Sequence, residues 1–168
     1  MGLFAIGLLI FVPMLAEAAR ARRNERAQKV RGGVEPRDDV YNIMRIVYPA
    51  AFLAMLFEAA ARPTPPTGST AIVVLGLAAF AAAKIIKWAA ILTLGQSWTF
   101  RVIVVPGDAL VVSGPYRYLR HPNYVGVIGE LVGAALMTRA VVTGPIAVIV
   151  FAILLRKRIR VEERALNI

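Results

Sequence analysis

The chain alternates long apolar runs with short polar or basic segments. Three long runs cover Gly2–Ala19, Tyr41–Ala61 and Thr70–Leu94, and two shorter runs cover Tyr124–Thr138 and Ala140–Leu155. A helix needs about 20 mostly apolar residues to cross the hydrocarbon core of a bilayer. The pattern therefore predicts an all-α integral membrane protein with about five transmembrane helices. The last two runs are short for full spans, so we expect them to form a tilted helical hairpin.

The segments between the runs carry helix-breaking residues. Residues 62–68 form a proline-rich turn in which a helix cannot continue. Residues 96–123 contain Pro106-Gly107 and Gly114-Pro115, which predict a loop with short pieces of strand or helix. Gly144-Pro145 is expected at the turn of the hairpin or just inside the last helix. We expect residues 1–168 to form a single membrane domain, with three spans in residues 1–94 and a basic loop at residues 20–40.

Composition supports the membrane assignment and excludes some chemistry. Of the 168 residues, 58% are hydrophobic, and the mean hydropathy of +0.66 is too high for an ordinary soluble domain. The chain has no cysteine, which excludes disulfides, thiolate metal sites and a cysteine nucleophile. Its single histidine cannot form a metal site alone. We therefore expect no metal cofactor.

The positive charges predict the orientation in the membrane. Residues 20–37, 96–123 and 156–164 carry fifteen of the 20 Lys and Arg residues, and a five-span topology places all three segments on one side. By the positive-inside rule we expect this side to be the cytoplasm, with the N-terminus outside and the C-terminus inside. We expect the membrane to be a bacterial inner membrane. The basic block at residues 20–31, within this loop, is expected to form an interfacial helix that binds lipid headgroups rather than a nucleic-acid patch. Ala16-Glu17-Ala18 resembles a signal-peptide cleavage site, but the arginine block after it opposes export.

The candidate chemistry lies after residue 95. Residues 114–124 hold three tyrosines, two arginines and His121, and Pro122 stops any helix from running through the histidine. A backbone fixed in this way immediately before a span suits a ligand clamp, although an interfacial loop also collects Tyr and Arg. Near the C-terminus, Arg158 and Glu162 are four residues apart and share a helix face. That spacing suits either a salt bridge or two halves of one site.

Three further residues have two interpretations each. Glu130 is an acid within the fourth apolar run, where an ionisable group is a candidate functional residue. It could bind substrate, or it could pair with Lys84 or Lys87 of the third run. Trp88 and Trp98 are expected to anchor the protein at the membrane interface rather than to bind a ligand.

The order of these motifs resembles a known family. Ser113-Gly-Pro-Tyr, Arg120-His-Pro-Asn-Tyr-Val-Gly, a helical hairpin and Arg158-x-x-x-Glu-Glu are similar to the isoprenylcysteine carboxyl methyltransferase family over Asp108–Leu166. Arg22-Arg-Asn, Arg31-Gly-Gly-Val-Glu and Thr93-Leu-Gly-Gln-Ser-Trp resemble a compact bacterial branch. Members of that branch often accompany type III polyketide synthases and O-methylate alkylresorcinols or alkylpyrones. Arg-His-Pro-Asn-Tyr also occurs in the much longer membrane sterol reductases.

The resemblance implies a methyltransferase that uses S-adenosylmethionine, with its cofactor-binding region in residues 95–168. The residues it assigns to the cofactor are Arg101, Asp108, Ala109, Leu110, Val111, Tyr116, His121, Pro122, Asn123, Tyr124 and Glu162. Arg158 would face the acceptor, with His121 as a second catalytic residue and Glu130 as a candidate substrate contact. Relatives often continue past the Glu pair with a Gly- and Tyr-containing segment, which puts prenyl-cysteine specificity in doubt for a chain ending at Ile168.

The implied reaction is methylation of an oxygen (carboxylate, enol or phenol) on a lipophilic substrate that enters from the bilayer. Isoprenylcysteine carboxyl methylation and phospholipid N-methylation are close alternatives. A membrane reductase that uses NADPH is a more distant one, although the chain has no Gly-rich dinucleotide fingerprint. A non-enzymatic membrane scaffold is the last, and it would leave the Tyr, Arg and His residues of the loop unexplained.

Overall fold

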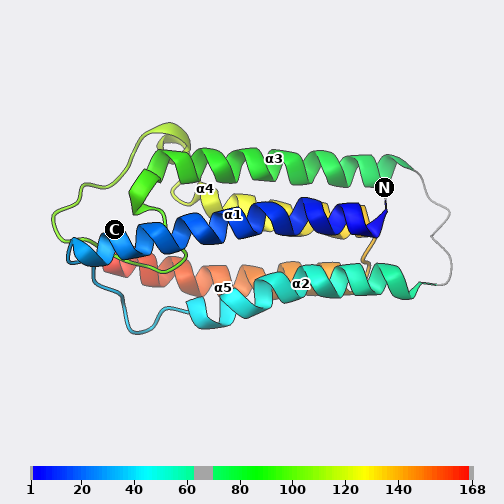
Figure 1. Ribbon diagram of the computed structural model, residues 1–168, viewed down its shortest axis with the longest axis horizontal. Coiled ribbons are helices and arrows are strands. Elements are labelled where there is room, and N and C mark those ends of the chain that lie inside the picture. Colours follow the sequence, from blue (N-terminus) through cyan, green and yellow to red (C-terminus); the bar gives the residue numbers. More distant parts are fainter. Residues whose placement is uncertain (1, 63–69, 167–168) are drawn as a thin grey trace.

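The structure, a computed structural model, describes residues 2–62 and 70–166. Five α-helices run roughly parallel or antiparallel to one long axis (Figure 1). Two short 3-10 helices, η1 and η2, lie between α3 and α4. No strand occurs in the described ranges, where Val34 and Val104 form one isolated antiparallel bridge. The elements are α1 Leu3–Val30, α2 Tyr41–Ala61, α3 Thr70–Leu94, η1 Gly95–Ser97, η2 Gly114–Arg117, α4 Pro122–Thr138 and α5 Thr143–Leu166.

The helices have the length and the surface of a membrane protein. Residues 3–30, 41–61 and 70–97 are each long and apolar enough to cross a membrane. Large apolar side chains face outward on all five described helices, among them Leu15, Phe57, Ile85 and Ile153. A soluble protein rarely exposes so much apolar surface, so these faces belong in lipid. The all-helical fold is confirmed, and a count of about five spans stays a prediction because α4 and the apolar half of α5 are shorter.

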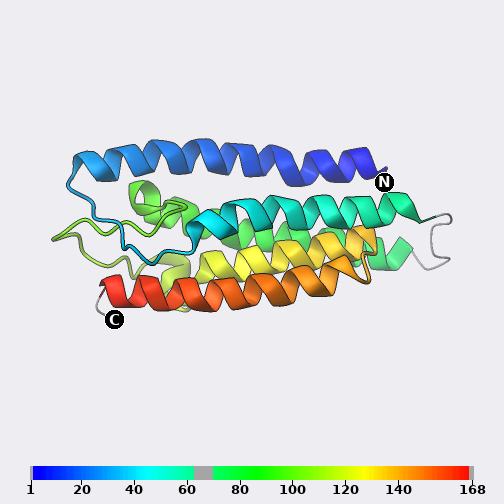
Figure 2. The same cartoon turned by 90° about the horizontal axis from the view of Figure 1, so that it is seen from below.

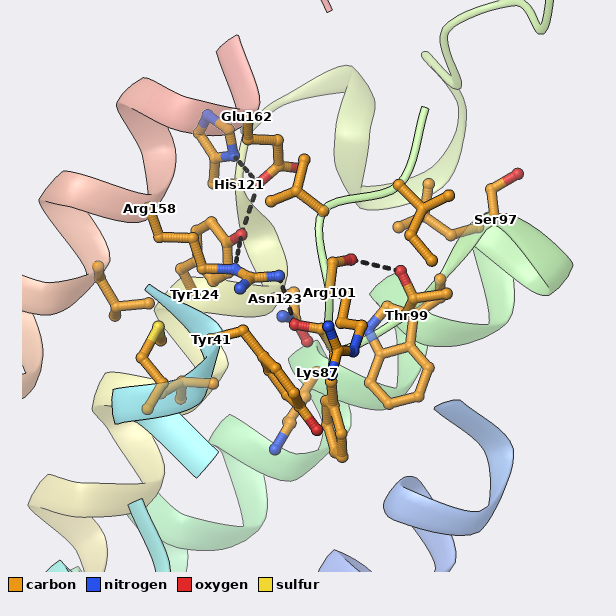
Figure 3. Close-up of a pocket in the computed structure, with 18 of the residues that line it drawn as sticks. Tyr41, Lys87, Ser97, Thr99, Arg101, His121, Asn123, Tyr124, Arg158 and Glu162 are labelled. Carbon is orange, nitrogen blue, oxygen red and sulfur yellow. Dashed lines mark hydrogen bonds and ion pairs between the residues drawn. The ribbon is translucent and has the colours of Figure 1, made fainter. Parts of the chain in front are cut away.

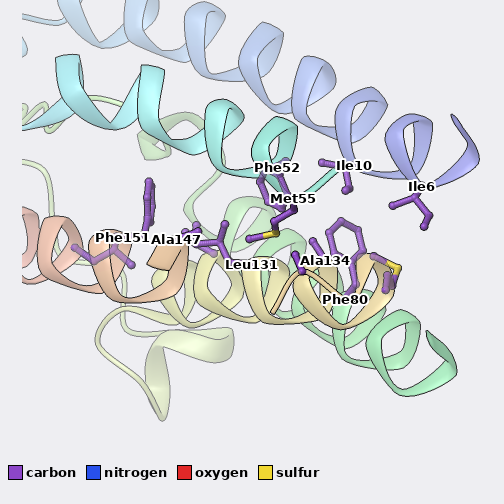
Figure 4. Close-up of a cluster of buried hydrophobic side chains, with 13 residues drawn as sticks. Ile6, Ile10, Phe52, Met55, Phe80, Leu131, Ala134, Ala147 and Phe151 are labelled. Atoms are coloured by element: carbon purple, nitrogen blue, oxygen red, sulfur yellow. The ribbon is translucent and has the colours of Figure 1, made fainter. Parts of the chain in front are cut away.

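Helix α4 lies at the centre of the bundle, and glycines let it approach α3 closely. A Cβ atom on Gly133 would lie 2.6 Å from the backbone nitrogen of Phe80, and one on Gly76 would lie 2.6 Å from that of Met137. No side chain fits at such distances, so the two helices pack backbone against backbone. The apolar core continues outward from this contact to α1, α2 and α5, where Ile10, Phe52 and Phe151 are buried (Figure 4).

The end of the bundle that holds the α4–α5 turn is tied by Glu58 of α2. Its carboxylate accepts hydrogen bonds from the Thr143 backbone nitrogen at 2.8 Å and the Thr143 hydroxyl at 2.6 Å. Arg62 donates to the Arg139 carbonyl at 2.6 Å. The expected hairpin is present, and Gly144-Pro145 lies in the first turn of α5. Apart from Arg62, the predicted turn at residues 62–68 lies outside the described residues.

The opposite end is the basic end, formed by residues 20–41, 94–122 and 156–166. The two chain ends lie at opposite ends of the bundle (Figure 2). The predicted loop at residues 20–40 is wrong for residues 20–30: these residues are helical, but they continue α1 instead of forming a separate interfacial helix. The reason is a buried stripe that includes Asn24 and Gln28. Asn24 donates to the Gly95 and Trp98 carbonyls at 2.9 and 2.7 Å, so one face of α1 packs on η1.

Candidate functional site

A cavity of about 810 Å³ opens at the basic end. Small-molecule sites usually have about 300–1,000 Å³, so this one has room for a drug-sized ligand and part of another. Its wall comes from α1, α2, the second half of α3, the loop before α4, the start of α4, and α5 (Figure 3). Most of the predicted site residues line it, namely Arg101, Asp108, Ala109, Leu110, Val111, Tyr116, His121, Asn123, Tyr124, Arg158 and Glu162.

The start of α4 carries one half of the site. Pro122 occupies the first turn of α4 and His121 is its N-cap. The helix thus begins two residues before the predicted Tyr124 and, as predicted, does not run through the histidine. The ring of His121 stacks on that of Tyr124, with centroids 5.4 Å apart. The Tyr124 hydroxyl donates to the Glu162 carboxylate, and His121 Nε2 lies 3.3 Å from Glu163. The predicted loop and tail therefore meet in one cluster of α4 and α5 residues (Figure 3).

Arg158 is the charged centre of this cluster, and its side chain is only 6% exposed. Its Nε donates to the Tyr124 hydroxyl at 2.9 Å, and its Nη2 donates to the Phe100 carbonyl at 2.5 Å. Its Nη1 donates to Asp39 at 3.0 Å. Arg158 and Glu162 do not form a direct ion pair within the described structure. Tyr124 joins Arg158 to Glu162, and the two charged residues line the same cavity.

The opposite wall holds Arg101 and Asp108. Arg101 donates to Glu35, and its guanidinium lies over the Tyr41 ring, 4.6 Å from the centroid. The hydrogen bond to Glu35 raises the pKa of Arg101 above its ordinary value. Asp108 forms an ion pair with Arg31 at 2.5 Å. Arg101 and Asp108 are therefore both paired with residues at or just after the end of α1. These contacts fix the position of this wall of the cavity.

Two polar groups in the wall are suited to a ligand. The Oδ1 atom of Asn123 is buried and has no hydrogen-bond partner within the described part of the chain. A buried acceptor without a partner costs about 1–3 kcal/mol, which a donor on a ligand would recover. Tyr116 lies in η2, where burial, with the charge of Glu162 as a second cause, raises the pKa of its phenol. Tyr116 therefore stays protonated and can donate a hydrogen bond.

Two predicted site residues lie away from the cavity. Pro122 is buried and shapes the loop but is not part of the wall. Glu130 is 1% exposed, lies outside the wall and pairs with Lys84 at 3.1 Å and Lys87 at 3.3 Å. Both lysines also pair with Glu17, at 2.8 and 2.7 Å. The assignment of Glu130 to substrate is corrected to its alternative, because two opposite charges already compensate this carboxylate inside the bundle.

The sequence did not identify the contribution of the first hundred residues to the cavity. Two residues of this part, Tyr41 and Trp98, line the cavity. A third, Asp39, holds Arg158 of the cavity wall. The pattern Asp39-Val-Tyr41 before a helix is a local signal, because an aspartate there often accepts a hydrogen bond from the backbone two residues on. Trp98 was expected at the membrane interface. It is 3% exposed, packs against Phe100 and lines the cavity.

The fold and the site define a class, an all-helical membrane protein with a large cavity at one end of its bundle. The sequence model of the Isoprenylcysteine carboxyl methyltransferase (ICMT) family matches residues 74–168, more than half of the chain. The protein belongs to this family and is a membrane methyltransferase. The family predicted from the loop and tail motifs is thereby confirmed, and neither a reductase nor a scaffold is favoured.

Individual relatives span most of the chain. YpbQ of Bacillus subtilis, described as uncharacterized, is 35% identical over 160 residues, 95% of this chain and 93% of YpbQ. An uncharacterized protein of Haemophilus influenzae is 27% identical over 146 residues, 86% of this chain and 83% of that protein. Protein-S-isoprenylcysteine O-methyltransferase A of Arabidopsis thaliana is 34% identical over 98 residues, 55% of this chain and 48% of the plant protein. No solved structure matches significantly.

Proposed function

We propose that the protein uses S-adenosylmethionine to methylate an oxygen of a lipophilic acceptor at the cytoplasmic face of the membrane. One observation carries the proposal. The cavity has polar groups suited to a cofactor at Glu162, Tyr116 and Asn123, and it also reaches the lipid-facing surface of the bundle. Leu15 of α1 and Ile46 of α2 both line it and are 70% and 63% exposed. A lipid-soluble acceptor would therefore enter between α1 and α2.

The residues of the cavity fit S-adenosylmethionine. Asn123 Oδ1 would accept a hydrogen bond from the adenine amino group, and the Glu162 carboxylate would accept from hydroxyl or ammonium groups. The Tyr116 ring would stabilise the sulfonium cation by about 0.5–2 kcal/mol. The backbone and side chains of Asp108, Ala109, Leu110 and Val111 would line the pocket, and His121 and Tyr124 would close it toward α5. Arg101 would lie at its far wall.

The required chemistry is mostly positioning. When bound, S-adenosylmethionine would supply an electrophilic methyl group. The acceptor oxygen would attack the methyl carbon in line with the methyl–sulfur bond, so that the C–O bond forms as the C–S bond breaks and S-adenosylhomocysteine leaves. The chain must hold the acceptor oxygen at contact distance and exclude water. A phenol, with a pKa near 10, would gain from the positive charge of Arg158, which favours the phenolate, or from His121 as a general base. We assign the larger effect to Arg158, and a carboxylate acceptor would arrive already ionised.

Oxygen is the acceptor atom that the comparisons favour. The plant relative is named as an O-methyltransferase, and it matches the part of the chain that holds the proposed cofactor residues. The three segments of the basic end carry fifteen of the 20 Lys and Arg residues of the chain. By the positive-inside rule, this concentration supports a cytoplasmic location for the cavity. S-adenosylmethionine is made and held in that compartment, so the cofactor would reach the site from the basic end.

Calorimetric titration of the detergent-purified protein tests the cofactor. We expect saturable binding of S-adenosylmethionine, no binding of NADPH, and a large loss of affinity in Glu162→Gln. Arg164→Gln is the matched control, because this neighbour on α5 is 69% exposed and pairs only at the surface with Asp38. Binding of NADPH without S-adenosylmethionine would reject the proposal, as would equal affinities for Glu162→Gln and the wild type.

A further inference from the structure

We propose that Asp39 is a positioning residue that fixes the guanidinium of Arg158 for the methyl acceptor. The inference rests on the proposed function, in which Arg158 faces the acceptor. Asp39 lies in the connection between α1 and α2, outside the residues 74–168 that match the family. The N-terminal part of the chain would thus complete a site whose other residues lie in the last third.

The Asp39 carboxylate is itself held rigidly. Its Oδ1 accepts from Arg158 Nη1 at 3.0 Å and from the Tyr41 backbone nitrogen at 3.1 Å. Its Oδ2 accepts from the Val102 backbone nitrogen at 3.0 Å, and the side chain is 4% exposed. Two of these three donors are backbone groups, at the start of α2 and in the cavity wall. These two backbone contacts fix the orientation of the Asp39 carboxylate independently of its contact with Arg158.

Arg158 gains a fixed plane from this contact. A guanidinium carries five N–H donors in a rigid planar fork. Within the described structure, Nε binds Tyr124, Nη2 binds the Phe100 carbonyl and Nη1 binds Asp39. Three nitrogens with three anchors define the plane completely. One N–H on each terminal nitrogen is then left over in a side chain that lines the cavity, and these two donors suit an acceptor oxygen.

Asp38, the adjacent residue, provides a matched control. It carries the same charge in the same connection and also contacts α5, through an ion pair with Arg164. Its side chain is 55% exposed, and exposed ion pairs of this kind contribute little. Replacing Asp38 changes the net charge and the surface of the connection as much as replacing Asp39 does, but it leaves the contacts of Arg158 intact.

A spectroscopic experiment tests the contact without any acceptor. The full-length protein is produced with arginine labelled with nitrogen-15 and purified in detergent for nuclear magnetic resonance. The Nε–H signal of Arg158 is assigned by its absence from the spectrum of Arg158→Lys. We expect this signal to shift and to exchange faster with water in Asp39→Asn and in Asp39→Ser, and to stay unchanged in Asp38→Asn. An unchanged signal in folded Asp39 variants would overturn the proposal.

A kinetic experiment tests the consequence. Transfer of a tritiated methyl group from S-adenosylmethionine is measured with pentadecylresorcinol and with N-acetyl-S-farnesylcysteine as acceptor probes. We expect kcat for Asp39→Asn to fall about 10- to 100-fold, because misplacement of a catalytic group by about 1 Å has effects of this size. Cofactor affinity should not change, and Asp39→Asn should have little further effect in an Arg158→Lys background, because both changes disturb the same group.

Other outcomes separate this inference from the proposed function. Wild-type kcat in Asp39→Asn, or independent and additive losses in the double variant, would overturn the positioning role while the methyltransferase assignment stands. A wild-type protein that neither binds S-adenosylmethionine nor transfers methyl would reject the proposed function. The Arg158 signal would in that case still decide whether Asp39 holds this guanidinium.

Discussion

At the scale of single residues, one hydroxyl joins the two charged side chains of the site. Tyr124 donates to Glu162 and accepts from Arg158 Nε, so a neutral group separates the proposed cofactor ligand from the proposed acceptor ligand. The arrangement lets Glu162 and Arg158 lie near one another without forming a direct ion pair that would cancel both. Each keeps hydrogen-bonding capacity for a different ligand.

Replacing Tyr124 with Phe should therefore damage both halves of the site. We expect a loss of about 1–3 kcal/mol in the free energy of unfolding, because two hydrogen bonds to charged groups disappear. Methyl transfer should fall with it. Thermal unfolding in detergent and the tritium assay measure the two effects. Tyr118→Phe is the control, since Tyr118 is 81% exposed in the same loop. Identical behaviour of the two variants would contradict this role of Tyr124.

Most of the site residues predicted from the sequence line the cavity, but the sequence did not predict how they are held. The loop at residues 114–124 and the Arg158–Glu162 spacing carry local motifs, which is why those residues could be identified in advance. The contact of Asp39 with Arg158 joins residues 119 positions apart. It depends on how the α1–α2 connection crosses the end of α5, which no local pattern encodes. The role of Glu130 was left open for the same reason.

At the scale of helices, the backbone contact between α3 and α4 places the loop that precedes α4. Gly133→Ala should destabilise the bundle by about 1–3 kcal/mol, because the new methyl group would overlap the Phe80 backbone and force the helices apart. Gly7→Ala of α1 is the matched control, since its Cβ would meet only a side-chain atom of Leu56 at 3.8 Å. Circular dichroism during heating compares them, and equal unfolding temperatures would contradict the packing argument.

The buried charges of α1, α3 and α4 form a second inter-helix contact. Lys84 and Lys87 neutralise Glu17 and Glu130, so removal of one charge leaves another uncompensated. We expect Lys87→Met to destabilise the protein by about 3–5 kcal/mol. Lys87→Met combined with Glu130→Gln should be more stable than Lys87→Met alone, because Lys84 and Glu17 remain as a balanced pair. A double variant less stable than the single one would contradict this account of the cluster.

Helix boundaries followed the sequence where hydropathy alone determines them. The predicted limits of α2 and α3 agree with the structure, because apolar runs end at Pro- or charge-rich segments. The extension of α1 to Val30 could not be predicted in this way. Its basic residues suggested a loop, whereas its buried polar stripe has partners in η1, a segment about 70 residues later in the chain.

At the scale of the whole molecule, the two ends of the bundle have different tasks. The end that holds the α4–α5 turn carries Glu58, Arg62 and Arg139, which tie helices together. The basic end holds the cavity, and its wall combines residues of all five described helices with the loop before α4. Between these ends the outer surface of the bundle is apolar, and this surface meets the cavity at Leu15 of α1 and Ile46 of α2. This arrangement suits an enzyme that takes one substrate from water and another from lipid.

Transfer of a labelled methyl group in living membranes tests this account most directly. Bacteria that express the protein are fed methionine with a deuterated methyl group, and their extracted lipids are compared by mass spectrometry with those of cells that express Arg158→Ala or Arg164→Gln. We predict a lipid-soluble species that carries the intact deuterated methyl group on oxygen with the wild type and with Arg164→Gln, and its absence with Arg158→Ala. No labelled species above the Arg158→Ala level, with the wild-type protein folded in the membrane, would contradict the account.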